Sequence, residues 1–483
     1  MNLLSNTKWV AFSQGVKVLV QLLNIVVLAR ILPPEEYGLM AMALVVINLA
    51  MLVRDLGTSA AIIQRNELSD RTINAVFWLN MYMGIGICFS MVFLSPYISV
   101  FFGEKKLQFI LLLLAFSFPL GSSSATHLAL LERKSEFKKV ARIEVVSSLL
   151  SFFVAVTMAV MGFGVLSLVF QIIVLNLLST LQLWIASKWR PSINKIWDKD
   201  ELKGILGFSA NLTGFNLINY FSRNSDVVII GHFMSSVILG SYSLAYRIML
   251  FPLQSLTFVI TRSLFPILSR NQENSCEIKR VYCNVFYYIL FIVMPLMLGL
   301  AFLSKEFVSI VFGNKWMLSA DILFWLAPTA IIQSVLSVSG TIFMSKGRTN
   351  ILMVLGVVGA FFQVSAFLLG VKFDIIVFSK FYFIANVLNF FSVMFSVHSL
   401  IKFSVRELFF KILPIILSSF IMLMGLFFYK LYLIIHVSNV FYFYSSILAG
   451  ALMYGVSISF VDGNIRRVIF NFISLNFKKN MNS

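Results

Sequence analysis

Residues 93–105 read FLSPYISVFFGEK, and residues 302–315 read FLSKEFVSIVFGNK. The two stretches share most of their residues although the chain runs for some two hundred positions between them. Other signals recur at a similar spacing, because Pro119 and Pro328 are 209 positions apart and Gly38 and Gly240 are 202 positions apart. This recurrence predicts that the chain contains two copies of one structural unit.

The composition indicates the environment of that unit. The 483 residues are 59% hydrophobic and 12% charged, and the mean hydropathy is +0.91. A soluble domain carries about 25% charged residues, so we expect a membrane protein. The net charge of +18 would suit a nucleic-acid-binding protein, but such proteins gather Lys and Arg in one patch. Here these residues stand in short clusters between apolar runs, and we expect no nucleic-acid partner.

Spans of the membrane need about 20 largely apolar residues. The sequence predicts an all-α polytopic fold with about fourteen such helices, because the strands of a membrane barrel are about 10 residues long and alternate in polarity. The predicted spans are residues 9–31, 37–62, 76–101, 107–131, 141–162, 163–187, 207–231, 237–262, 283–304, 317–345, 350–371, 374–401, 408–429 and 438–461.

Charge in the loops predicts the orientation. With a cytoplasmic N-terminus, most of the 38 Lys and Arg residues fall in cytoplasmic loops, as the positive-inside rule requires. Both termini are then cytoplasmic. The predicted division is an N-lobe of six helices (1–188), a cytoplasmic linker (189–206), a C-lobe of six helices (207–401), and two further helices with a cytoplasmic tail (402–483). Since six is even, both lobes enter the membrane in the same sense, as in transporters with parallel repeats.

The first helix of each lobe carries polar residues on one face. Their spacing of i, i+3, i+7 and i+10 places each set on one side of its helix. A charge at the bilayer centre costs at least about 2.5 kcal/mol, so both faces should look into protein or a water-filled cavity. Polar packing between helices is the alternative, and Arg223 and Asp226 could simply pair. The two sets are Gln14, Lys17, Gln21 and Asn24, and Asn216, Asn219, Arg223 and Asp226.

Cations within predicted spans suggest what such a cavity would bind. Lys17, Arg54, Arg223 and Arg247 lie at different depths, and Lys17, Arg54 and Arg247 have no obvious acidic partner nearby in the sequence. A cationic, polar interior suits an anionic substrate group, and the planar fork of arginine suits phosphate particularly well. The three cysteines match no metal or redox spacing, and we expect no metal and no cofactor.

Residues 13–65, SQGVKVLVQLLNIVVLARILPPEEYGLMAMALVVINLAMLVRDLGTSAAIIQR, resemble polysaccharide transporters of the MOP superfamily. These are the Wzx-type O-antigen and exopolysaccharide flippases, with the colanic-acid exporters among them. LARILPPEEYG followed by DLGTSAAIIQR is the most specific part, and TRSLFPILSRNQ (261–272) and SVSGTIFMSKGRTNI (337–351) also fit. The resemblance covers nearly the whole chain. It implies two six-helix lobes around a central cavity that opens alternately to either side.

The same resemblance implies the cargo and the setting. The cargo would be a lipid-linked oligosaccharide on undecaprenyl pyrophosphate, flipped across the bacterial plasma membrane for lipopolysaccharide or exopolysaccharide synthesis. The protein would bind membrane lipid and would not be an enzyme. Related lipid II flippases place arginines on the first, second and eighth helices, where this chain has Lys17, Arg54 and Arg247. A coupling ion (Na⁺ or H⁺) and partner proteins such as a glycan polymerase or a chain-length protein remain open.

Three other functions compete with the flippase. A cation-coupled multidrug exporter of the same superfamily would need an acidic residue early in the first lobe, where the first helix has Lys17 and no acid. A membrane glycan polymerase or glycosyltransferase would need activating carboxylates and a large external loop, and the sequence indicates neither. A scaffold would need no charges within its spans. We therefore favour the flippase, with the identity of its glycan open.

Overall fold

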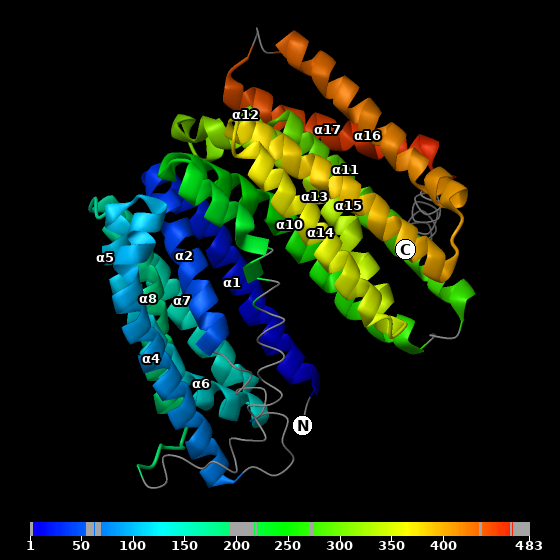
Figure 1. Ribbon diagram of the computed structural model, residues 1–483. Coiled ribbons are helices and arrows are strands. Elements are labelled where there is room, and N and C mark those ends of the chain that lie inside the picture. The colour runs from blue at the N-terminus through cyan, green and yellow to red at the C-terminus, as the bar shows by residue number, and fades with distance from the viewer. Residues whose placement is uncertain are drawn as a thin grey trace, which may run out of the picture. The chain divides into compact units, whose positions relative to one another are not determined.

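The computed structural model describes residues 3–54, 62, 69–193, 217, 220–221, 223–270, 274–433, 437–463 and 466. These residues form helices and no strand, as predicted (Figure 1). Twelve helices in this part of the chain are long and apolar enough to cross a membrane, and they coincide with twelve predicted spans. The predicted span 207–231 lies largely outside the described residues, and 237–262 falls within the 35-residue helix α10. The count of fourteen therefore stays a prediction.

Contacts divide the chain into two compact units, Met1–Ser243 and Leu244–Ser483. Residues 223–233 are helical and belong to the first unit, as does the start of α10. The predicted lobe boundaries at 188 and 207 stay a prediction. The first unit holds α1 (Leu3–Ile31), α2 (Pro34–Arg54), α4 (Asp70–Phe102), α5 (Lys105–Ala115), α6 (Ser117–Arg133), α7 (Phe137–Val160) and α8 (Val165–Ala186).

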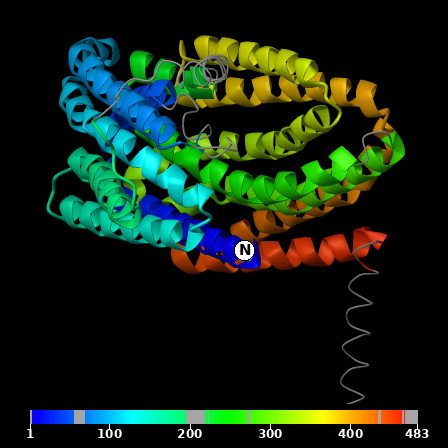
Figure 2. The same cartoon turned by 90° about the horizontal axis from the view of Figure 1, so that it is seen from below.

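The second unit begins within α10 (Ser236–Arg270). Its last two helices, orange to red in Figure 2, pack on each other and on the first helix after α10. Its elements are α11 (Ser275–Phe302), α12 (Ser304–Val311), the short 3₁₀ helix η1 (Asn314–Trp316), α13 (Met317–Ser345), α14 (Thr349–Gly370), α15 (Ile375–Ile401), α16 (Val405–Leu433) and α17 (Asn439–Val461).

The internal repeat is visible in how each unit packs. In the first unit, α4 contacts α6, α6 contacts α7 and α8, and α7 contacts α8. In the second unit, α11 contacts α13, α13 contacts α14 and α15, and α14 contacts α15. Helix for helix, these are the same contacts. The duplication predicted from the repeated phrase is therefore a duplication of packing.

The two glycines of the repeat meet where α2 crosses the start of α10, inside the first unit. A β-carbon on Gly38 would collide with the backbone oxygen of Ser236, and one on Gly240 would collide with that of Pro34. Pro34 and Ser236 are 202 positions apart, as the glycines are. The contact is therefore reciprocal, since each glycine approaches the backbone four residues before the other glycine. Glycine permits this backbone approach because it has no side chain.

Candidate functional site

The polar face of α1 is open over its first half. Gln14 and Gln21 are exposed although they lie within the candidate span Lys8–Ile31. Between them, the half-buried Lys17 places its Nζ 2.8 Å from Oε1 of Glu144 on α7. The premise that Lys17 lacks an acidic partner is therefore wrong. Glu144 is the only carboxylate of α7, and it neutralises the lysine across the helix interface.

The second half of the same face is packed. Asn24 is half-buried, and its Oδ1 accepts a 2.8 Å hydrogen bond from Nε2 of Gln171 on α8. At Asn24 the structure therefore agrees with the alternative expectation, in which the polar residues of this face pack between helices. The face of α1 therefore changes along its length, with exposed amides at Gln14 and Gln21 and a hydrogen-bonded amide pair at Asn24.

The corresponding face in the second copy is only partly described. Asn216 and Asn219 lie outside the described residues. Arg223 is exposed, whereas Asp226 is 3% exposed and its Oδ2 accepts a 2.8 Å hydrogen bond from the hydroxyl of Tyr242. Asp226 thus faces α10, and within the described residues it forms no ion pair with Arg223. We keep Arg223 as a candidate substrate contact and drop Asp226 from the proposed lining.

The predicted cations of α2 and α10 belong to different units. Arg54 ends α2 and is half-buried in the first unit. Its Nη1 lies 2.5 Å from the place where a β-carbon on Gly121 would stand, so this glycine of α6 makes room for the guanidinium. Arg247 is half-buried on α10 in the second unit. Among the described residues, no hydrogen-bond or ion-pair partner faces Arg247.

Sequence reasoning missed three partners of the predicted residues, which are Glu144, Gln171 and Tyr242. Each is a polar side chain within a largely apolar helix, which was the available signal. What the sequence does not contain is the rotation of one helix against the next. The pairings Lys17–Glu144, Asn24–Gln171 and Asp226–Tyr242 all cross a helix interface, so they depend on that rotation.

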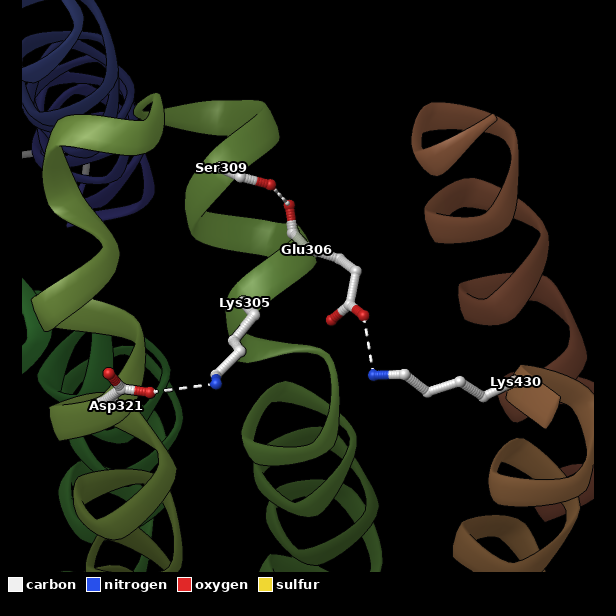
Figure 3. A network of polar contacts seen from close by, with 5 residues as sticks. All are labelled: Lys305, Glu306, Ser309, Asp321 and Lys430. Atoms are coloured by element: carbon white, nitrogen blue, oxygen red, sulfur yellow. Dashed lines mark hydrogen bonds and ion pairs between the residues drawn. The ribbon is translucent and has the colours of Figure 1, made fainter. Parts of the chain in front are cut away.

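A separate ionic cluster in the second unit ties α16 to α12 (Figure 3). Nζ of Lys430 lies 2.9 Å from Oε1 of Glu306, and Nζ of Lys305 lies 3.5 Å from Oδ1 of Asp321. The glutamate side chain is 13% exposed, so its charge depends on the lysine from the neighbouring helix. The cluster stands at the second copy of the repeated phrase and was not predicted.

Comparison with solved structures agrees with this architecture. The lipid II flippase MurJ in an inward closed conformation superposes with a TM-score of 0.74 at 16% identity, covering 96% of this chain and 100% of that chain. An inward-facing multidrug resistance MATE transporter of the MOP superfamily gives a TM-score of 0.55 at 15% identity, covering 80% and 96%. At these identities the likeness concerns the fold, which is that of MOP-superfamily transporters, as the sequence predicted.

Similar sequences are named for surface polysaccharides. The teichuronic acid biosynthesis protein TuaB of Bacillus subtilis is 27% identical over 352 residues, which is 72% of each chain. The lipopolysaccharide biosynthesis protein WzxC of Escherichia coli is 28% identical over 369 residues, covering 76% of this chain and 75% of that protein. A family model described as polysaccharide biosynthesis protein matches residues 27–321, more than half of the chain. The chain therefore belongs to this polysaccharide biosynthesis protein family.

Proposed function

We propose that this protein flips a lipid-linked oligosaccharide from the cytoplasmic to the outer leaflet of a bacterial plasma membrane, for the synthesis of a surface polysaccharide. Membership of the family supports the pathway, because TuaB and WzxC are named for teichuronic acid and lipopolysaccharide biosynthesis. The fold shared with a lipid II flippase supports the type of transport. The protein acts as a transporter with cytoplasmic termini, and not as an enzyme.

One observation carries the proposal furthest: Gln14 and Gln21 are exposed on a helix that is apolar and long enough to span a membrane. Amide groups are costly to place against hydrocarbon. In the membrane, this face of α1 therefore borders water or a polar ligand. Sugar hydroxyls, which both donate and accept hydrogen bonds, match the chemistry of the two amides.

Arg54, Arg223 and Arg247 act on the pyrophosphate in this proposal. Lys17 is neutralised by Glu144 and serves the cargo only where that pair opens. The bacterial interior is negative, so outward movement of an anionic headgroup gains about 2.3 kcal/mol per charge per 100 mV. The protein then has chiefly to offset the desolvation of the phosphates, which fixed guanidinium groups do through paired N–H donors.

The test is surface glycan in a deletion strain that is complemented by each variant, with membrane protein levels measured alongside. Arg54→Glu and Arg247→Glu should each abolish export, whereas Arg54→Lys and Arg247→Lys should impair it less, since they keep charge and lose the fork. Arg348→Glu is the matched control, because Arg348 is an exposed cation at the start of α14. Full export by both Glu variants at Arg54 and Arg247 would refute their role.

A further inference from the structure

A cavity of about 320 Å³ lies between the starts of α11 and α16, within the second unit. By the predicted orientation both helices start on the cytoplasmic side, so the cavity stands at the inner surface of the membrane. Its polar walls are Lys279 and Arg280 of α11, Glu407 and Lys411 of α16, and the thiols of Cys276 and Cys283. Neither the predicted substrate cations nor the polar faces of the transport path contribute to it.

The cations of this cavity are unequally neutralised. Nζ of Lys279 lies 3.3 Å from Oε2 of Glu407, and Nη2 of Arg280 lies 2.9 Å from Oε1 of Glu277. Lys411 differs, because its Nζ bonds the amide oxygen Oδ1 of Asn284, which carries no charge. Across the described chain, no carboxylate lies within ion-pair distance of Lys411. Three cations thus line the cavity with one carboxylate, Glu407, while Glu277 pairs with Arg280 from outside the lining. Among these described groups, the surplus charge therefore sits on Lys411.

Exposed apolar side chains lie on both helices within a few residues of the Lys411–Asn284 contact. On α16, Val405, Phe409 and Phe410 are at least half exposed, and on α11 Tyr288 is 60% exposed. The Arg406 guanidinium lies 5.7 Å from the centre of the Phe410 ring. Aromatic rings beside basic groups are typical of the level where lipid headgroups meet hydrocarbon. A cation at this level, with apolar side chains on both helices, suits a ligand that joins a phosphate to acyl chains.

We propose that the cavity binds the phosphate of an anionic glycerophospholipid from the cytoplasmic leaflet, with Lys411 as its main contact. The phosphate takes the place beside Nζ that no carboxylate fills, while Lys279 and Arg280 widen the positive field. The acyl chains lie along the exposed apolar side of α16. The competing explanation is that these side chains only fasten α16 to α11, in which case the lipid headgroup makes no difference. The proposal goes beyond flipping and does not depend on it.

The native cysteines provide the assay. Cys276 is exposed in the cavity, and the half-buried Cys88 on α4 is an internal reference in the other unit. The purified protein is reconstituted in phosphatidylcholine vesicles with and without phosphatidylglycerol. Labelling of each cysteine by N-ethylmaleimide, which is uncharged, is followed by mass spectrometry. We expect phosphatidylglycerol to slow the labelling of Cys276 relative to Cys88.

Variants then locate the effect. Lys411→Gln should raise the phosphatidylglycerol fraction needed for half-protection about fivefold, the usual contribution of one lysine near an anionic surface. Asn284→Asp should weaken protection as well, because it gives Lys411 an acidic partner without removing it, and it serves if Lys411→Gln fails to fold. Arg348→Gln removes an exposed cation outside the cavity and should leave protection unchanged.

Three results would overturn the proposal. One is equal labelling of Cys276 in both kinds of vesicle. Another is the same loss of protection in Arg348→Gln as in Lys411→Gln, which would mean that general surface charge is responsible. The third is full protection by inorganic phosphate added to phosphatidylcholine vesicles, which would indicate a site for soluble anions. No oligosaccharide cargo is present, so a negative result leaves the proposed flipping untouched.

Discussion

The two copies of the repeated phrase end their helices differently. In the first copy, α4 continues to Phe102, and Gly103 caps it with a φ of 69° while its N–H donates to the carbonyl oxygens of Ser99 and Val100. In the second copy, α11 stops at Phe302 and the separate helix α12 begins at Ser304. Nearly equal sequences therefore give one long helix in one unit and a broken helix in the other.

The sequences are identical at the break, which reads FLS in both copies, and they differ directly after it. Where the first copy has Pro96 and Tyr97, the second has Lys305 and Glu306. Tyr97 is 74% exposed, whereas Glu306 is largely buried and bonds Lys430 of α16. The helices α16 and α17 have no counterpart in the first copy, and they pack on α11 and α12. At this position the second copy thus carries the glutamate that bonds the added helix α16, whereas the first copy carries Pro96 and the exposed Tyr97.

Membrane topology gives the largest expected effect, because each reporter reads on one side of the membrane or the other. It tests whether the two copies enter the membrane in the same sense. Six spans separate the two copies of the phrase, so reporters fused at Lys105 and Asn314 should both read external. Fusions at Lys188 and Asn274 should both read cytoplasmic. If the reporter at Lys105 and the reporter at Asn314 read on opposite sides of the membrane, a parallel repeat would be excluded.

The glycine crossing is expected to show the largest effect on stability. A side chain at Gly38 or Gly240 meets backbone, which cannot move aside as a side chain can. Gly38→Leu and Gly240→Leu should each destabilise the protein by about 3 kcal/mol or more. The measurement is the thermal midpoint and the yield of folded protein in detergent.

Gly86→Leu is the control for this crossing, since a β-carbon there meets nothing within 4 Å, and it should be close to neutral. Equivalence of the two copies predicts similar losses at both glycines. A harmless substitution at one of them would contradict the reciprocal contact.

The ionic tie between α12 and α16 should give a smaller loss. Glu306→Ala leaves Lys430 without its partner and should cost about 2 kcal/mol, less than a fully buried pair because Lys430 is 33% exposed. The equivalent change in the first copy, Tyr97→Ala, should cost under about 1 kcal/mol because Tyr97 is mostly exposed. Denaturation of both variants by heat checks this order. Equal losses, or no recovery in the exchanged pair Glu306→Lys with Lys430→Glu, would argue against the tie.

The weakest effect is expected at Lys17 and Glu144. Both side chains are about one-third exposed, at 32% and 34%, so breaking the pair should cost only about 0.5–1 kcal/mol. The exchange Lys17→Glu with Glu144→Lys should restore that stability. Export measured in the same strains separates two roles, since restored export would make the pair purely structural. Export that stays low would mean that the cation itself is needed on α1.

Hydropathy predicted fourteen spans, and twelve of them coincide with helices of the described residues. Recurrence predicted the duplication, and the resemblance of residues 13–65 implied the superfamily fold. The sequence did not predict the interruption of the helix after Ala115. The predicted span 107–131 consists of α5 and α6, and Pro119 falls in the first turn of α6, where a proline removes no helical hydrogen bond. Its counterpart Pro328 lies inside the continuous α13. Side-chain pairs such as Asp226–Tyr242 could not be predicted from the sequence, because they depend on tertiary packing.

The central claim is that this chain carries a lipid-linked oligosaccharide to the outer leaflet. The most direct measurement is the leaflet in which that oligosaccharide accumulates, read with a membrane-impermeant lectin on intact spheroplasts and on inverted vesicles. In a deletion strain, the lectin should bind the glycan only in inverted vesicles. When the wild-type chain is restored, the lectin should also bind the glycan on spheroplasts. Equal labelling of spheroplasts with and without the protein would contradict the account.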